Sequence, residues 1–166
     1  MEKSLFLWMM MLTVTAVEPP LYQRESAHMP DYRYVIAQVL EVVDGDTVDL
    51  SLDLGFSITY KVRVRILGID TPEKTGDQKV YGLAVKEWVK QWFAAQKGPL
   101  YLVSKQWDKY GGRVLGDIQL QDGSSYSAML VTKGMGRAYN GEAKPAWTKA
   151  QLEAASAAAA LPISKP

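Results

Sequence analysis

The sequence predicts an α+β domain in which a five-stranded, OB-fold-like β-barrel packs against about three helices. Five short strand-like segments fall into two groups, with one helical segment between the groups and further helical segments after the second. The 166 residues, of which 48% are hydrophobic and 22% charged, suffice for one domain with an ordinary core. We therefore expect a single domain over residues 30–161 and a disordered tail over residues 162–166.

The first three strands are predicted to form a meander. Residues 35–43 are mainly β-branched and aliphatic and end at Asp44-Gly45, a dipeptide typical of tight hairpins. Residues 47–53 alternate between apolar and polar side chains, and a turn at Leu54-Gly55 leads into a second alternating segment, residues 58–67. The side chains of that segment predicted to face the core are Ile58, Tyr60, Val62, Val64 and Ile66.

The period then changes from two residues to that of an amphipathic helix, which Gly98-Pro99 ends. Two further strands, residues 100–104 and 114–120, are joined by a loop over residues 106–113. These two strands complete the five that a small barrel requires. The apolar stripe of the helix comprises Ala84, Val85, Trp88, Val89 and Trp92.

Two helices are predicted after the last strand. The first is short, starts at Ser125 or Ser127, both good N-cap residues, and ends at Gly134. The second is rich in alanine and ends before Leu161-Pro162. We place its start near Pro145, because proline is favoured in the first helical turn.

The amino-terminal residues 1–28 are predicted to lie outside the domain. The apolar run from Leu5 to Val17 is too short to span a bilayer but fits the core of a signal peptide, with Val14 and Ala16 suited to a cleavage site. The alternatives are a true start at Met29 and a loose membrane anchor. A signal peptide implies secretion, whereas without one we expect a cytoplasmic protein.

Composition excludes several kinds of active site. The chain has no cysteine, and His28 is its one histidine, so zinc sites built on these residues, thiol nucleophiles, Ser-His-Asp triads and histidine-dependent nucleases are ruled out. Carboxylates, arginines, tyrosines and a bound metal remain for hydrolysis. The net charge of +1 means that any attraction for nucleic acid must come from local basic clusters.

Acidic residues flank an arginine-bearing strand between Val42 and Glu73. Asp44 and Asp46 precede the second strand, and Asp70 and Glu73 follow the third. Carboxylates are hard oxygen ligands for calcium or magnesium, and one of them is a candidate general base. Arg65 lies five residues before Asp70 and supplies a fork-shaped cation for a phosphate. This set predicts metal-assisted attack on a phosphodiester, with Lys109, Tyr110 and Arg113 contributed by the loop before the last strand.

Each of these features also has a simpler interpretation. Asp44-Gly45-Asp46 alone is most readily a hairpin turn, and its acidic spacing does not match an EF-hand. Lys61 and Arg63 are most simply part of a solvated strand face. Tyr110 and Tyr139 are as suited to packing as to stacking on a base or ribose.

Five segments of the chain resemble the staphylococcal-type thermonuclease family. They occur in the order of that family between Asp44 and about Tyr139, which makes the resemblance far more specific than one motif alone. The segments are VVDGDTVDL, VRVRILGIDTPE, VYGLAVKEW, DKYGGRVLGDI and LVTKGMGRAY.

The resemblance implies a calcium-dependent nuclease that uses one Ca²⁺ ion and acts on DNA and RNA. It implies cleavage of the bond to the 5′ oxygen, which leaves 3′-phosphate ends. The expected substrate is single-stranded or locally melted nucleic acid, and the expected state is a monomer without a stable protein partner.

The resemblance also implies roles for individual residues. Asp46 and Asp70 resemble the side-chain calcium ligands of the family, and the main-chain carbonyl of Thr71 a further ligand. Arg65 and Arg113 resemble the two cations that clamp the phosphate, and Glu73 resembles the residue that activates the attacking water. The positions that contact the bound nucleotide are matched by Lys109, Tyr110 and Tyr139. Two glycines precede Arg113 where the family more often has one, so the chain departs from the family pattern at this residue.

Two other functional classes compete with this prediction. A non-catalytic nucleic-acid-binding barrel would keep the fold and the basic loop but lack the set of acids and arginines, which this chain retains. A restriction-type nuclease would combine Asp70 with Asp77 and Lys79 and would need the latter two on a core strand. They instead fall in a polar turn after Gly76.

Overall fold

The computed structural model describes residues 32–109, 111–141 and 143–163. The predicted leader over residues 1–28, Tyr110 and the last three residues of the predicted tail lie outside the described residues. Among the helices of the described ranges, none is both long enough and apolar enough to cross a membrane.

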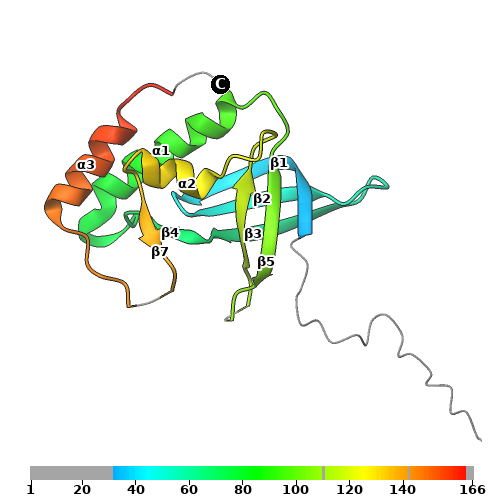
Figure 1. Ribbon diagram of the computed structural model, residues 1–166, viewed down its shortest axis with the longest axis horizontal. Coiled ribbons are helices and arrows are strands. Elements are labelled where there is room, and N and C mark those ends of the chain that lie inside the picture. The colour runs from blue at the N-terminus through cyan, green and yellow to red at the C-terminus, as the bar shows by residue number, and fades with distance from the viewer. Residues whose placement is uncertain (1–31, 110, 142, 164–166) are drawn as a thin grey trace, which may run out of the picture.

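Five strands close into a mixed barrel in the order β1-β2-β3-β6-β5 (Figure 1). All neighbouring strands are antiparallel except β3 and β6, which run parallel. The predicted α+β class with a five-stranded barrel is therefore confirmed. The strands are β1 (Tyr32–Asp44), β2 (Thr47–Asp53), β3 (Thr59–Ile66), β5 (Tyr101–Trp107) and β6 (Val114–Gln119).

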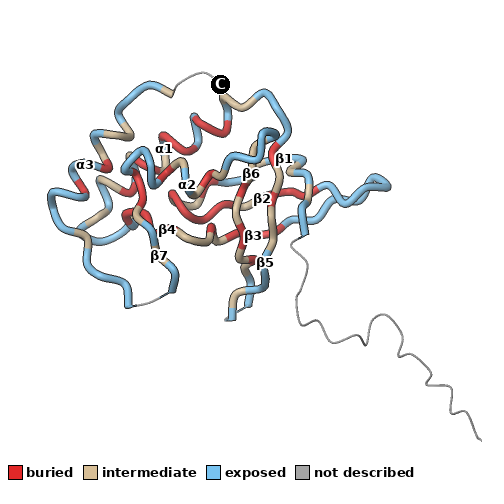
Figure 2. The backbone as a smooth tube through the Cα atoms, viewed as in Figure 1, coloured by how far each residue is buried: buried red, intermediate tan, exposed pale blue. Residues whose placement is uncertain are grey.

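The hairpin between β2 and β3 corrects one prediction. Val62, Val64 and Ile66 of β3 are buried as expected, but Ile58 and Tyr60 are 55% and 48% exposed. Figures 1 and 2 show the reason, since this hairpin projects beyond the barrel on the side away from α3 and reaches no core to cover it. An alternating pattern alone does not reveal where a strand leaves the barrel.

Three helices pack beside the barrel (Figure 1): α1 (Lys79–Ala95), α2 (Tyr126–Thr132) and α3 (Lys149–Ala159). Ser125, one of the two predicted starts, caps α2, because its hydroxyl accepts a hydrogen bond of 3.1 Å from the amide of Ala128. The predicted start of α3 near Pro145 is wrong. Thr148 is the N-cap and forms a capping box with Gln151, which satisfies amide groups that a start at a proline would leave unpaired.

A small second sheet, which the sequence pattern does not predict, joins the barrel to α3. It pairs β4 (Gly68–Asp70) with β7 (Arg137–Tyr139) in antiparallel register, with Asp70 opposite Arg137. Strands of three residues are too short to show an alternating pattern. A short 3₁₀ turn, η2 (Gly76–Gln78), follows β4 and leads into α1.

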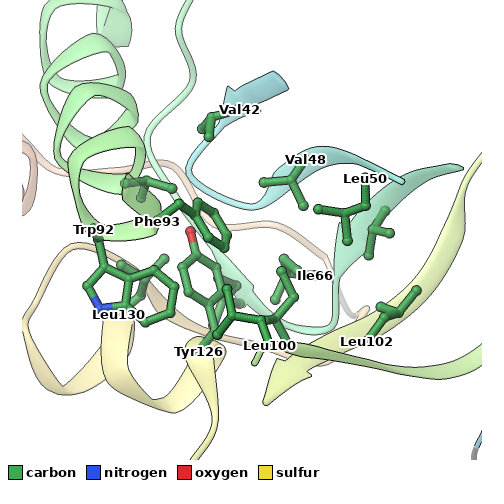
Figure 3. Packing of buried hydrophobic residues seen from close by; sticks show 14 of the residues in the cluster. Val42, Val48, Leu50, Ile66, Trp92, Phe93, Leu100, Leu102, Tyr126 and Leu130 are labelled. Atoms are coloured by element: carbon green, nitrogen blue, oxygen red, sulfur yellow. The ribbon is translucent and has the colours of Figure 1, made fainter. Parts of the chain in front are cut away.

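The core fills the space between the barrel and the helices, where the buried segments of the tube gather in Figure 2. Trp88 and Trp92 on α1 are 3% and 5% exposed, so they belong to the core as expected. Figure 3 shows Trp92 and Phe93 beside Tyr126 of α2, with ring centroids 5.2 Å and 5.5 Å from that of Tyr126. The Tyr126 hydroxyl donates a hydrogen bond of 2.7 Å to the carbonyl oxygen of Gly45. Tyr126 thus links α2 to the turn between β1 and β2.

Tyr126→Phe is expected to lower the free energy of unfolding by about 1–3 kcal/mol, because the buried carbonyl of Gly45 loses its hydrogen-bond donor. Urea denaturation of the parent and the variant measures the difference. Tyr60→Phe is the control, since Tyr60 is 48% exposed and its change should stay within about 0.5 kcal/mol. Equal losses in the two variants would contradict a structural role for the Tyr126 hydroxyl.

Candidate active site

Asp46 ties three separate elements together at the end of the barrel. Its Oδ2 atom lies 2.6 Å from Nη1 of Arg65 on β3 and accepts a 3.0 Å hydrogen bond from the amide of Thr71, just after β4. The Thr47 hydroxyl donates to its Oδ1 atom over 3.2 Å. A side chain at Gly45 would place its Cβ 2.8 Å from both Thr71 and Val85, so only glycine lets the turn approach this closely.

The guanidinium of Arg65 lies where β2, β3 and β4 meet. Arg65 pairs with Thr47 across the β2–β3 ladder and with Leu115 across the β3–β6 ladder. Its two terminal nitrogens donate to the carbonyl oxygens of Asp46 and Ile69, each over 3.2 Å. The side chain remains 18% exposed. Arg65 is therefore held by hydrogen bonds to the protein and still accessible to solvent.

Burial raises the pKa of Asp46 from 3.8 to about 7, although Arg65 acts in the opposite direction. Asp44 adds to the increase, because a second carboxylate nearby disfavours the charged form. Asp46 therefore takes up or releases a proton near neutral pH, unlike an ordinary surface aspartate.

The stability that Asp46 contributes should fall as pH rises. Folded protein keeps the proton between about pH 4 and pH 7, whereas the unfolded chain releases it, so deprotonation opposes folding in this window. We expect parent stability to fall by on the order of 3 kcal/mol relative to Asp46→Asn across this window, as measured by urea denaturation. A constant difference between the two proteins would contradict this.

Asp70 is fully buried, and its donors come from β7 and from the segment between β7 and α3. Its Oδ2 atom accepts hydrogen bonds from Nε of Arg137 over 3.0 Å and from Nε1 of Trp147 over 2.9 Å. The ammonium of Lys144 lies 2.6 Å from its Oδ1 atom. Arg137 also lies over the Trp147 ring, 4.4 Å from its centroid, and donates to the carbonyl oxygen of Pro145.

The sequence pattern does not predict these partners of Asp70. The three residues have no periodic spacing. Lys144 and Trp147 lie outside the five segments, and Arg137 falls within LVTKGMGRAY, where no role is predicted for it. The one available signal is Arg137 itself, a basic residue directly after Gly136. In the structure it pairs with Asp70 across the β4–β7 ladder. Only the pairing of β4 with β7 makes that position meaningful.

Glu73 stands on the loop between β4 and α1, with its side chain 50% exposed. Its Oε1 atom accepts a hydrogen bond of 2.8 Å from Lys144. Burial acts to lower the pKa of Lys144, but close contacts with the carboxylates of Asp70 and Glu73 outweigh it and raise the pKa above its usual value. A Cβ at Gly82 would lie 2.3 Å from the carbonyl oxygen of Glu73, so α1 packs directly against the Glu73 backbone.

Four of the predicted residues line one cleft of about 770 Å³: Arg65, Lys109, Arg113 and Tyr139. Arg113 comes just before β6 and therefore close to the end of β3, because Val114 pairs with Val64. Its guanidinium lies 2.5 Å from Asp108, which fixes it at the mouth of the loop. Gly111 and Gly112 have φ values of +72° and +74°, so the additional glycine gives the loop its turn.

The predicted metal ligands are buried and do not line this cleft. Asp46 contacts Arg65, and Arg65 in turn lines the cleft. Asp70 and Thr71 are 0% and 2% exposed. Carboxylate and carbonyl oxygens are the donors that calcium prefers, so the set fits that ion in kind. Within residues 32–109, 111–141 and 143–163, however, the acidic side chains do not gather into a group of three that could hold a metal. The cation found between Asp70 and Glu73 is Lys144.

The fold and this cluster define an OB-type barrel with a site of carboxylates and guanidinium groups at its strand ends. The family model described as "Staphylococcal nuclease homologue" matches residues 63–161, and the chain belongs to this family. The resemblance expected from the five motifs is therefore confirmed.

Two similar relatives carry names that refer to nucleases. A protein of Escherichia coli called "Uncharacterized endonuclease" is 30% identical over 102 residues, which cover 61% of this chain and 60% of the relative. "Thermonuclease" of Staphylococcus intermedius is 32% identical over 120 residues, which cover 70% of this chain and 66% of the relative. The chain thus spans less than two thirds of the length of the E. coli relative.

Proposed function

We propose that this protein is a calcium-dependent nuclease that hydrolyses phosphodiester bonds in DNA and RNA. The observation that carries the proposal is the cleft in which Arg65, backed by buried Asp46, faces the same space as Arg113. Membership of the staphylococcal nuclease homologue family and the names of the relatives support it. We further propose that the cut falls at the bond to the 5′ oxygen and leaves 3′-phosphate ends.

The arginines supply the positive charge that the reaction needs. Negative charge builds up on the nonbridging oxygens as water attacks phosphorus, so cations held in place beforehand lower the barrier. Arg65 is held by two main-chain carbonyls and Arg113 by Asp108, so neither guanidinium must be ordered when substrate enters. Lys109 and Tyr139 line the same cleft and would contact the nucleotide on either side of the phosphate.

The carboxylates would serve the ion and the water. Asp46, Asp70 and the main-chain carbonyl of Thr71 would hold one calcium ion, which when bound adds positive charge beside the phosphate. Glu73 has a half-exposed carboxylate and would orient the attacking water and accept its proton. The open cleft suits single-stranded or locally melted nucleic acid, and the proposed reaction needs only a monomer.

Nuclease assays on denatured DNA with calcium, with a chelator and with magnesium in place of calcium test this proposal. We expect cleavage with calcium, strong loss of cleavage with the chelator, and fragments that end in a 3′ phosphate. Undiminished cleavage in the chelator would overturn the calcium dependence. Tight binding of DNA with no cleavage under any condition would instead identify a non-catalytic nucleic-acid-binding barrel.

A further inference from the structure

Lys144 places a positive charge between Asp70, a proposed calcium ligand, and Glu73, the carboxylate proposed to orient the attacking water. Its Nζ atom lies 2.6 Å from Oδ1 of Asp70 and 2.8 Å from Oε1 of Glu73. These two acids come from the strand β4 and the loop after it, whereas Lys144 comes from the segment between β7 and α3. One ammonium group therefore contacts both carboxylates, while Arg137 also pairs with Asp70.

The two oxygens of Asp70 are satisfied in different ways. Oδ2 accepts hydrogen bonds from Arg137 and Trp147. Oδ1 is buried, and Nζ of Lys144 lies 2.6 Å from it. Within the described part of the chain, none of the contacts of Oδ1 has the geometry of a hydrogen bond. The ammonium of Lys144 is the cation beside Oδ1 in these described residues. Calcium binds carboxylate oxygens in flexible geometry, so an ion could take the place of this ammonium.

The contacts of Lys144 also make it replaceable. Its side chain is 38% exposed, and it stands outside any helix or strand. If it withdrew, Arg137 and Trp147 would still hold Oδ2 and keep the Asp70 side chain in position. Oδ1 of Asp70 and Oε1 of Glu73 would then be the atoms left without their cation.

We propose that Lys144 is an internal cation which holds Asp70 and Glu73 in the calcium-free protein and which calcium must displace in order to bind. This inference rests on the proposed function, because it takes Asp70 as a calcium ligand. Its consequence is a calcium affinity set by competition, since only the fraction of molecules with Lys144 withdrawn is ready to bind. The protein would therefore bind calcium more weakly than its carboxylates alone allow.

Calorimetric titration of the metal-free full chain with calcium chloride tests the competition. We expect Lys144→Met to bind calcium about tenfold more tightly than the parent, because the ion no longer has to replace an ammonium group. Lys149→Met is the matched control. Lys149 is close in sequence, is 84% exposed and lies 3.8 Å from Glu153, so its loss removes the same charge without opening the site. We expect its calcium affinity to stay within about twofold of that of the parent.

Three results would overturn the inference: an unchanged affinity in Lys144→Met, no binding of calcium by Lys144→Met, or an equal gain in Lys149→Met. Thermal unfolding without calcium shows whether each variant is folded, and Lys144→Gln repeats the test with a polar side chain. A different result would contradict the proposed function. If the parent protein does not cut denatured DNA in the presence of calcium, the proposed function is wrong, whatever the order of the calcium affinities.

Discussion

Arg65→Ala should lower kcat on denatured DNA by about 10²–10³-fold, because it removes a preorganised cation from the place where phosphate charge develops. Arg65 is the one residue that both contacts the buried carboxylate of Asp46 and lines the cleft with Arg113 among the residues that the structure describes. The variant also leaves Asp46 buried without its cation. We therefore expect a moderate loss of stability, and turnover should be measured well below the melting temperature, with circular dichroism as the check on folding.

Arg63→Ala provides a control on the same strand. Arg63 projects from the same face of β3, two residues earlier, but its guanidinium pairs with Asp49 over 2.6 Å and 2.7 Å and is 47% exposed. Because it does not line the cleft, its removal should change kcat by less than about threefold. If the two variants lost activity equally, the loss would reflect net charge or strand stability, and the role assigned to Arg65 would be wrong.

Asp70→Asn should lower the free energy of unfolding by about 3 kcal/mol, because it leaves the partly buried cation of Arg137 without its negative partner. Asparagine has nearly the shape of aspartate, so the effect isolates the charge. Three groups depend on this carboxylate, namely Arg137, Lys144 and Trp147. Lys144 contributes less than Arg137, because its side chain is 38% exposed and water screens its charge.

Asp49→Asn is the matched surface variant for that measurement. Asp49 also pairs with an arginine, but the side chains of Arg63 and Asp49 are 47% and 23% exposed. Urea denaturation should therefore show a loss below about 1 kcal/mol. A similar small loss in Asp70→Asn would mean that the donors around Asp70 do not stabilise the fold.

The sequence predicts the barrel well where its pattern is long. Strands β2 and β3 alternate over several residues and end at recognisable turns, so their positions and their antiparallel pairing follow directly. The sheet of β4 and β7 could not be predicted, because three residues show no period and its pairing is long-range. Pro145 predicts too early a start for α3, because the capping box of Thr148 and Gln151 fixes where the helix begins.

The sequence likewise predicts one part of the candidate site and not the other. The register of β2 against β3 brings Asp46 and Arg65 together, and the motif that joins them to Asp70 is visible in the sequence. The partners of Asp70 are not visible, because Arg137 and Trp147 are 67 and 77 residues away along the chain. A local pattern cannot identify contacts over such separations, and only the folded chain reveals that basic groups surround this acid.

A double-mutant cycle on Arg65 and Arg113 tests most directly whether both arginines act on one phosphate in the cleft. The measurement is kcat on denatured DNA for Arg65→Ala, Arg113→Ala and the variant that carries both substitutions. Residues that act as a unit are not additive, so we predict that the double variant is within about threefold of the slower single variant. Losses that simply multiply, or an Arg113→Ala variant as active as the parent, would contradict a shared phosphate site.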